Sequence, residues 1–291
     1  MPAHVSVVIP TYNRAELLPR AIDSVLGQSV PARDIWVIDD CSTDNTEQLL
    51  KQKFPSIGYK RMTSKSNASV ARNLGIDQSA GDYIAFLDSD DEWEYDHLAN
   101  AITGIESEPA CCGCAASFVV HSGQKTIVRA FQRQLSSDPL NDVLSGRIDI
   151  RTSSLVIRTE DARRAMFDEQ LEKHQDWDFA ARLGAHKPLL VLPAASVKIN
   201  SALGDRMSAA PNHAASAYFL AKHASELDQR SKARFQLDLA YRTFRISGRN
   251  KRFWRYWIDA ALGVHHLSPR GLAKLSVCVT PLGRFALKKV G

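Results

Sequence analysis

The amino-acid sequence predicts an α/β fold with a doubly wound, mostly parallel sheet, followed by a helical C-terminal region. Short apolar runs alternate with segments of helical periodicity through the N-terminal half, an order typical of βαβ units. Acidic residues directly follow two of these runs, at the strand ends where ligands bind in such sheets. From about residue 211 onward the pattern is helical.

Strands are expected in the N-terminal half at the apolar runs 5–9, 35–38 and 83–87, with a short further strand at 59–62. A helix is predicted over 15–28, because apolar residues recur there with a 3.6-residue period and Gly27 lies near its end. Capping residues at 42–45 predict the start of a second helix. A third helix is expected across 69–78.

The middle of the chain is less regular. Strands are expected at 115–120, 155–157 and 189–192, and a helix around 176–183. The later helical region should be interrupted at three places: Ser247-Gly248, Pro269 and Pro281. A composition shift near residue 205 predicts two domains, 1–205 and 206–291.

The composition of this 291-residue chain, 44% hydrophobic and 24% charged, is ordinary for a soluble protein. No apolar stretch reaches about 18 residues, so no transmembrane helix is predicted, and the first residues lack a signal-peptide pattern. Five cysteines, odd in number and unevenly spaced, favour a reducing compartment over a disulfide framework. We therefore expect a cytoplasmic location.

Three cysteines lie together at Cys111, Cys112 and Cys114. They lie in an apolar segment that continues through 115–120 and is expected to be a buried strand, and they lack the paired spacing of structural zinc ligands. We interpret them as buried thiols that act as small hydrophobic residues.

The charge of the chain is uneven. From residue 229 onward there are about 14 Lys and Arg against 2 Asp and Glu, so this segment is strongly basic and the rest is acidic. Part of it interleaves cationic and aromatic residues: Arg249, Lys251, Arg252, Phe253, Trp254, Arg255, Tyr256 and Trp257. This mixture suits peripheral contact with an anionic membrane at the inner face of the cell. Helices packed on the rest of the protein are the equal alternative, and no nucleic-acid partner is expected.

The most informative segment is Asp88-Ser89-Asp90-Asp91, which directly follows the apolar run 83–87. Carboxylates this close repel one another. A divalent cation bridging to a polyphosphate would offset the repulsion, since hard oxygen ligands suit Mg²⁺ or Mn²⁺. The other interpretation is a turn with a helix N-cap, because Asp and Ser favour both.

Five motifs, spread in one order over residues 5 to 183, resemble those of family 2 glycosyltransferases. They are VVIPTYNR at 7–14, VIDDCSTD at 37–44, ARNLGI at 71–76, FLDSDD at 86–91 and HQDWD at 174–178. Five motifs in the family's order carry far more weight than any one of them. The resemblance does not cover the chain beyond about residue 210.

The resemblance implies the GT-A fold, a nucleotide-sugar donor (most often a UDP-sugar), a divalent Mn²⁺ or Mg²⁺ and inversion at the anomeric carbon. The loop after the first strand would contact the base and ribose through Pro10, Thr11, Tyr12 and Arg14. Of these, Tyr12 would stack on the base. By similarity Asp40 accepts a hydrogen bond from the uracil imide, and Asp39 orients the loop. An ordinary turn with capping aspartates is the alternative.

Four further residues are expected near the diphosphate and the metal. The fork of the Arg72 guanidinium suits a diphosphate, the alternative being a solvated surface arginine. By similarity Asp88 contacts the ribose or the metal shell, and Asp90 ligates the metal with Asp91 as a competing ligand. Arg206, in a loop that matches the family loosely, would reach a phosphate.

Asp176 matches the family's catalytic base. Inversion in a single displacement needs a carboxylate beside the acceptor hydroxyl. Family members usually have Glu-Asp here, whereas this chain has Gln175-Asp176, so the supporting Glu is replaced. Asp178 is expected to cap the helix that follows. The alternative for Asp176 is that it is merely the helix N-cap.

The sequence therefore predicts an inverting, metal-dependent glycosyltransferase. It would transfer a hexose-type sugar from a nucleotide-diphosphate donor to a cell-envelope glycan or glycolipid acceptor, including lipid-linked ones. The alternative is a non-catalytic nucleotide-sugar-binding protein of the same fold, which the replacement at Gln175 suggests. The donor sugar, the linkage and the oligomeric state do not follow from the sequence.

Overall fold

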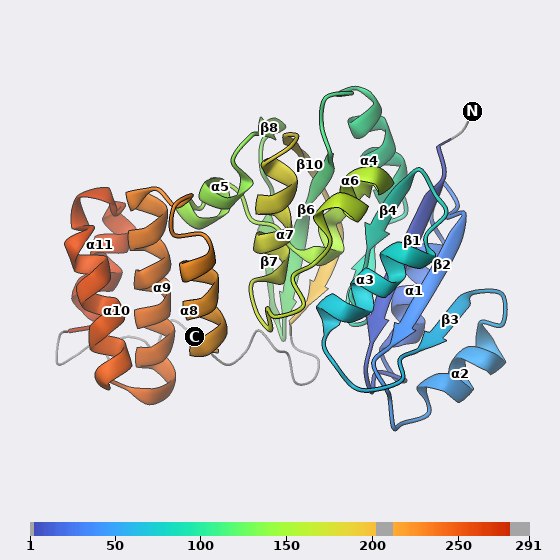
Figure 1. Cartoon of the computed structure of the whole chain (residues 1–291), viewed down its shortest axis with the longest axis horizontal. Coiled ribbons are helices and arrows are strands. Elements are labelled where there is room, and N and C mark those ends of the chain that lie inside the picture. Colours follow the sequence, from blue (N-terminus) through green and yellow to red (C-terminus); the bar gives the residue numbers. More distant parts are fainter. Residues whose placement is uncertain (1–2, 202–211, 280–291) are drawn as a thin grey trace. The chain divides into compact units, whose positions relative to one another are not determined.

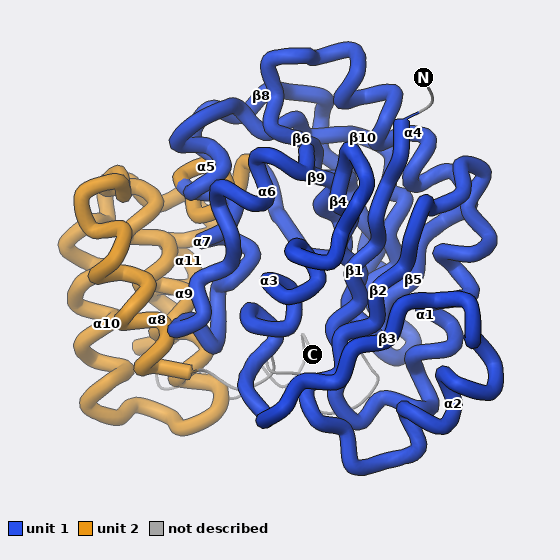
Figure 2. The backbone as a smooth tube through the Cα atoms, turned by 45° about the vertical axis from the view of Figure 1, so that its right-hand side comes forward, with its two compact units in different colours: residues 1–140, 148–207 blue, residues 141–147, 208–291 orange. Residues whose placement is uncertain are grey.

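The computed structural model describes residues 3–201 and 212–279. The chain divides into two compact units, residues 1–140 with 148–207 and residues 141–147 with 208–291 (Figure 2). The domain boundary that the composition predicts at 205 lies outside the described residues and stays a prediction. Residues 141–147 join the later unit although they lie far from it in sequence.

The first unit holds a ten-stranded sheet with the order β3-β2-β1-β4-β9-β6-β10-β5, in which β7 pairs with β6 and β8 with β10 (Figure 1). The strands are β1 (Val5–Thr11), β2 (Asp34–Asp39), β3 (Gly58–Arg61), β4 (Tyr83–Phe86), β5 (Glu92–Trp93), β6 (Gly113–Ser122), β7 (Lys125–Arg129), β8 (Gln134–Ser136), β9 (Leu155–Arg158) and β10 (Leu189–Asn200). Strand β9 runs antiparallel to both β4 and β6, so β1, β2, β3, β4, β6 and β10 all point one way. The predicted mostly parallel sheet is confirmed.

The helices of this unit are α1 (Leu18–Leu26), α2 (Thr46–Lys53), α3 (Ala68–Gln78), α4 (His97–Glu106), α6 (Thr159–Ala165) and α7 (Gln175–Gly184), with the 3₁₀ turn η1 (Thr152–Ser154). Helix α5 (Pro139–Ser145) continues into the later unit. The first helix begins at Leu18, three residues later than predicted. Pro19 fits in its first turn, where the missing N–H has no helical partner. The sequence analysis did not predict α4, α5 or α6.

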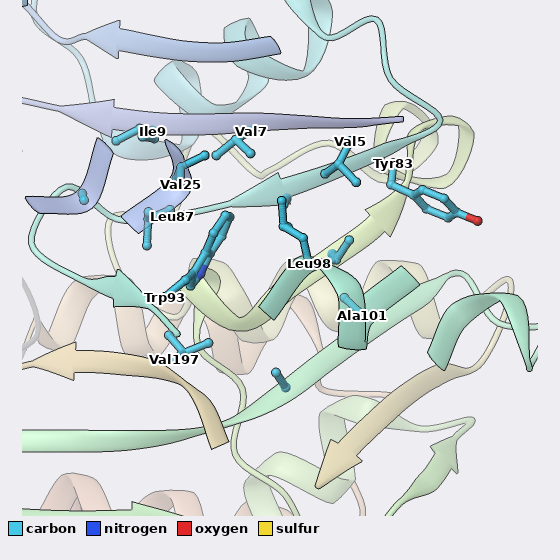
Figure 3. Packing of buried hydrophobic residues seen from close by; sticks show 14 of the residues in the cluster. Val5, Val7, Ile9, Val25, Tyr83, Leu87, Trp93, Leu98, Ala101 and Val197 are labelled. Atoms are coloured by element: carbon cyan, nitrogen blue, oxygen red, sulfur yellow. The ribbon is translucent and has the colours of Figure 1, made fainter. Parts of the chain in front are cut away.

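One face of the sheet packs against α1 and α4. Alternate residues of β1, namely Val5, Val7 and Ile9, point to this face and are fully buried (Figure 3). Val25 of α1 and Leu98 of α4 belong to the same core cluster. All these side chains lie on one side of the sheet, because side chains alternate along a strand.

The opposite face packs against α3. A Cβ placed on Gly75 of α3 would lie 2.2 Å from Cγ1 of Val8 in β1, so only glycine lets the helix come this close to the strand. The ring of Phe86 in β4 meets those of Phe167 and Phe179 edge-on, with centroids 5.3 and 5.8 Å away. Helices therefore cover both faces, as a doubly wound sheet requires.

The cysteines predicted to be buried thiols are buried. Cys114 lies in β6, and both Cys111 and Cys114 belong to the core cluster that contains β1. Burial raises the pKa of all three thiols, Cys111, Cys112 and Cys114. They therefore act as small hydrophobic groups.

The second unit is helical, with α8 (His213–Lys222), α9 (Gln229–Ser247), α10 (Lys251–Leu262), α11 (Pro269–Val277) and the 3₁₀ turn η2 (Val264–His266). The predicted breaks at Ser247-Gly248 and Pro269 are confirmed, and Pro281 lies outside the described residues. Side chains cap α9, α10 and α11 at Asp228, Asn250 and Ser268. Within the described ranges, no helix has the length and apolar character to cross a membrane.

We predict that Gly75→Ala lowers the free energy of unfolding by about 1–3 kcal/mol, because the new methyl group overpacks against Val8. This sign is the opposite of the helix propensities, which favour Ala over Gly by about 1 kcal/mol. Chemical denaturation measures the difference, with Asp77→Ala at an exposed position of the same helix as the control. A more stable Gly75→Ala protein would show that α3 does not lie this close to β1.

Candidate active site

The carboxyl ends of β1, β2 and β4 lie at one edge of the sheet. Thr11 at the end of β1 is in register with Asp39 at the end of β2, and Val8 is in register with Phe86 of β4. The residues that follow these three strands are therefore neighbours in space, where doubly wound sheets bind ligands.

Asp39 shapes the loop after β2. It is fully buried, and its Oδ1 accepts hydrogen bonds from the backbone N–H of Ser42 at 2.8 Å and from the Ser42 hydroxyl at 2.6 Å. Its Oδ2 accepts one from the Tyr59 hydroxyl at 2.8 Å. Both carboxylate oxygens of Asp39 thus already accept hydrogen bonds that hold the loop. Of the two aspartates, Asp40 is therefore the one able to bind a ligand.

Asp40 lies beside Tyr12 and Lys65. Its buried carboxylate accepts a hydrogen bond through Oδ1 from the backbone N–H of Ser66 at 2.6 Å, and its own N–H donates to the carbonyl of Thr11 at 2.9 Å. Burial raises the pKa of Asp40, while the Ser66 N–H and the Lys65 cation act in the other direction. The Lys65 ammonium lies 3.6 Å from the Tyr12 ring centroid, so it covers one face of that ring. Lys65 lies outside the motifs and was not among the predicted site residues.

Pro10 and Thr11, predicted in the loop after the first strand, lie instead in β1 itself, because the strand continues to Thr11. Pro10 pairs in register with Ile38 inside the sheet. The Thr11 hydroxyl is buried and has no hydrogen-bond partner among the described residues. Arg14 borders a surface hollow that Asn13 and Asp44 also line. Arg206 lies outside the described residues, so its predicted role is untested.

Arg72 joins α3 to the acidic loop and to α7. Its Nη2 donates to Oδ1 of Asp88 at 2.7 Å, and its Nη1 donates to Oε1 of Gln175 at 2.9 Å. The guanidinium also lies 5.2 Å from the Phe167 ring centroid. Only 4% of Arg72 is exposed, so the alternative of a solvated surface arginine is wrong.

Hydrogen bonds from Ser153 and Asn200 hold the acidic loop after β4, residues 88–91, in its conformation. The backbone N–H of Asp88 donates to Oγ of Ser153 at 3.1 Å, and that hydroxyl donates to Oδ2 of Asp91 at 2.7 Å. The other Asp91 oxygen accepts from the backbone N–H of Asn200 at 3.1 Å. The Asn200 side chain donates to the carbonyl oxygen of Asp90 at 3.0 Å. Asp91 is buried, whereas Asp88 and Asp90 are partly exposed.

The aspartates of the acidic loop could supply some, but not all, of the ligands of a hard divalent cation. Nowhere in residues 3–201 and 212–279 do three or more His, Cys, Asp or Glu side chains form a set of metal ligands. Mg²⁺ and its relatives are, however, commonly held by one or two carboxylates together with substrate phosphates. The partly exposed Asp88 and Asp90 fit that arrangement.

Asp176 is the second residue of α7, and its side chain is only partly exposed. Burial, with a smaller contribution from the charge of Asp149, raises the pKa of this carboxyl to about 6. The Arg151 cation, the Trp177 N–H and Arg72 act in the other direction. A carboxylate with this pKa is ionised near neutral pH yet still basic enough to take a proton.

The start of α7 differs from the prediction in its capping. The N-cap is His174, with a φ of 65°, so the interpretation of Asp176 as an N-cap is wrong. Asp178 is not a cap either. It lies inside the first turns, where its Oδ2 accepts from Nε of Arg182 at 3.1 Å. The His174 ring instead stacks on Trp177, with centroids 5.0 Å apart.

Comparison with known proteins identifies the class. Residues 6–167, more than half of the chain, match the family model described as glycosyl transferase family 2. The chain is 31% identical over 218 residues to the amylovoran biosynthesis glycosyltransferase AmsB of Erwinia amylovora, covering 69% of this chain and 71% of AmsB. It is 28% identical over 259 residues to the putative colanic acid biosynthesis glycosyl transferase WcaA of Escherichia coli K12, covering 86% and 90% of the two chains.

The structure also resembles that of TarS from S. aureus in complex with UDP-GlcNAc, with a TM-score of 0.69 and 20% identity over 98% of this chain and 88% of the other. At this identity the likeness shows the fold, and the predicted GT-A fold is confirmed. The protein is a glycosyltransferase. It belongs to glycosyltransferase family 2.

We predict that Asp176→Asn stabilises the fold at neutral pH. The pKa of Asp176 is about 6 in the folded chain against an ordinary value of 3.8, so folding takes up a proton between these pH values. Stability therefore falls as pH rises through this window, and above it the ionised group destabilises the fold by about 2–3 kcal/mol.

Removing the charge should raise the free energy of unfolding by about that amount at pH 7 and change it little below pH 4. Urea denaturation at the two pH values measures this, with the exposed Asp77→Asn as the control. An equal effect of Asp176→Asn at both pH values would contradict the raised pKa.

Proposed function

We propose that this glycosyltransferase transfers a hexose-type sugar from a UDP-sugar to a cell-envelope glycan or glycolipid, with inversion and with Asp176 as the general base. The observation that carries the proposal is the Asp176 carboxylate, with its pKa of about 6, on α7, whose first residue, Gln175, binds Arg72. The names of AmsB and WcaA, both tied to polysaccharide biosynthesis, support the acceptor class. The TarS complex with UDP-GlcNAc supports the donor class.

The nucleoside would bind at the ends of β1 and β2. Oδ1 of Asp40 accepts from Ser66, so Oδ2 would accept the uracil imide hydrogen. The uracil ring would stack on the face of Tyr12 that Lys65 does not cover. Lys65 would then neutralise Asp40 in the free protein and lie near the donor phosphates when the donor binds.

The diphosphate would lie beside the acidic loop, near the Arg72 guanidinium that Asp88 holds. A Mn²⁺ or Mg²⁺ ion, when bound, supplies positive charge that stabilises the departing nucleoside diphosphate. Asp90 is the better ligand in this proposal, because both oxygens of Asp91 already accept hydrogen bonds from Ser153 and Asn200. Asp88 would complete the shell while holding Arg72 in place.

Asp176 would accept the proton of the acceptor hydroxyl as that oxygen attacks the anomeric carbon. The bond between the sugar and the diphosphate oxygen breaks in the same step, and the electron pair leaves with UDP. One displacement of this kind inverts the anomeric configuration. Arg151, whose Nη2 donates to Asp149 at 3.2 Å, keeps positive charge near the base and so limits the rise of its pKa.

We predict that Asp176→Asn lowers kcat by at least about 100-fold while leaving the Kd for UDP within about two-fold, since general-base catalysis contributes about 10² to 10⁴. For the wild type, kcat/KM should rise with pH and level off above about 6, because the base must be ionised. Transfer assays with UDP-sugars and UDP calorimetry measure both quantities, and Asp77→Asn serves as the control. Full activity of Asp176→Asn would refute the assignment.

We also predict that UDP with Mn²⁺ raises the melting temperature more than UDP alone, and more than GDP, dTDP or CMP. A ligand at 100 times its Kd stabilises a fold by about 2.7 kcal/mol. Asp90→Asn should abolish the increment from Mn²⁺. Asp91→Asn should lower the melting temperature without ligand, because Ser153 and Asn200 lose a charged partner, and keep the increment.

The opposite result, with Asp91→Asn alone losing the increment, would reverse the ligand assignment. If UDP binds but neither transfer nor slow donor hydrolysis is detected, the chain binds nucleotide sugars without catalysis. If no nucleotide shifts the melting temperature, the assignments of Asp40 and Arg72 fail together.

A further inference from the structure

Helix α10 in the second unit presents an exposed apolar stripe. Trp254, Ile258 and Leu262, four residues apart, lie on one side of the helix and are 41%, 50% and 78% exposed. Phe253, Tyr256 and Ala260 lie on the other side and are buried in the core of this unit. The apolar side chains of the stripe therefore lie largely outside that core.

Cations flank the stripe. With 3.6 residues per turn, Lys251 and Arg255 lie on the same outward side as Trp254 and Ile258, and Arg252 lies at its edge. All three cations are exposed, and none forms an ion pair with a carboxylate in the part of the chain that the structure describes. The single acidic residue of α10, Asp259, is half-buried.

The aromatic residues of α10 fall into two groups, one packed inside the unit and one exposed. Phe253 and Tyr256 pack inside the unit, and Nε1 of Trp257 donates to the carbonyl of Leu275 at 3.0 Å. Trp254 is exposed, with its ring held edge-on against those of Phe253 and Trp257 at centroid distances of 5.0 and 5.9 Å. The ring is thus fixed in an outward position before any partner binds.

We propose that this face of α10, formed by Trp254, Ile258 and Leu262 with Lys251, Arg252 and Arg255, docks on the surface of an anionic phospholipid membrane. A helix that lies in the membrane interface has an apolar side with Trp or Leu and flanking Lys or Arg. The 12 residues of α10 are far too few to span a bilayer but suffice for a helix lying flat.

The charge of this face favours a membrane over a second copy of the chain or a nucleic acid. A symmetric pair of chains joined through this face would set the three cations of one copy against those of the next, which is unfavourable. Nucleic acid would suit the cations, but Ile258 and Leu262 offer aliphatic surface instead of stacking rings. A lipid surface satisfies both features, since phosphates meet the cations and the interface takes the apolar stripe.

Membrane docking would bring the proposed glycosyltransferase to a lipid-linked acceptor and so rests on the proposed function. Binding to vesicles can nevertheless be measured without a sugar donor or acceptor. The full chain is sedimented with vesicles of phosphatidylcholine, with and without phosphatidylglycerol. We expect binding only with phosphatidylglycerol and weaker binding at high salt. Replacing Lys251, Arg252 and Arg255 together by Gln should lower partitioning by about 100-fold, since each cation near an anionic surface contributes about five-fold.

The matched control removes three exposed cations from α9: Arg230, Lys232 and Arg242, each replaced by Gln. It has the same net charge as the first variant and should retain most of the binding. The triple change Trp254→Ala, Ile258→Ser and Leu262→Ser should lower partitioning at least ten-fold. The melting temperature should fall only slightly, because Ile258 and Leu262 are exposed and Trp254 loses only its edge contacts with Phe253 and Trp257.

Three results would overturn the inference: no binding to phosphatidylglycerol vesicles at low salt, equal loss in the α9 control, or equal binding to pure phosphatidylcholine. Gel filtration and a labelled oligonucleotide test the rival occupants. A dimer that the apolar triple change dissociates, or oligonucleotide binding without vesicle binding, would replace the membrane as the partner. Transfer to a water-soluble acceptor should stay unchanged in all variants, which separates failure here from failure of the proposed function.

Discussion

The candidate site depends on the hydrogen bonds that the buried guanidinium of Arg72 makes. A buried charge is expensive unless it is paired and hydrogen-bonded, so Arg72 requires Asp88 from the loop after β4 and Gln175 from the start of α7. Those two partners lie far apart in the sequence. One arginine on α3 thereby fixes the acidic loop and the helix that carries Asp176 in a common frame, with Phe167 against its guanidinium.

The hydrogen bonds of Gln175 explain why glutamine can replace the family's Glu at this position. Its Oε1 accepts from Arg72 while its Nε2 donates to the carbonyl of Leu171 at 2.6 Å. An amide makes both bonds, whereas a carboxylate could only accept. Gln175 therefore keeps a positioning contact and adds no negative charge near Asp176. The departure from the family pattern is compatible with catalysis, and Arg72 keeps Asp88 as its only charged partner among the described residues.

A second set of contacts divides the acidic residues by their roles. Ser153, on the short turn before β9, binds both the backbone of Asp88 and the side chain of Asp91, and Asn200 at the end of β10 binds the same loop. Asp91 therefore belongs to the framework, while Asp88 and Asp90 keep access to solvent. Asp39 and Asp40 divide in a similar way after β2, since Asp39 binds Ser42 and Tyr59. In both loops, one carboxylate, Asp39 or Asp91, is held by hydrogen bonds within the fold, and the ligand roles are proposed for the others.

The alternation of strands and helices, the doubly wound sheet and the motifs at its carboxyl edge follow from the sequence alone, because apolar periodicity and strand-end polar residues are local features of the chain. Helices α4, α5 and α6 do not follow in this way, nor does the cap of α7, where His174 and not an aspartate is the N-cap. Tertiary packing sets the rest: Arg72 is buried, Lys65 lies over Tyr12, and Arg151 lies near Asp176. It also buries Phe253 while the neighbouring Trp254 is exposed. Each of these depends on which distant residues fold against one another, and the burial and pairing of a charge are set by that packing and not by its neighbours in sequence.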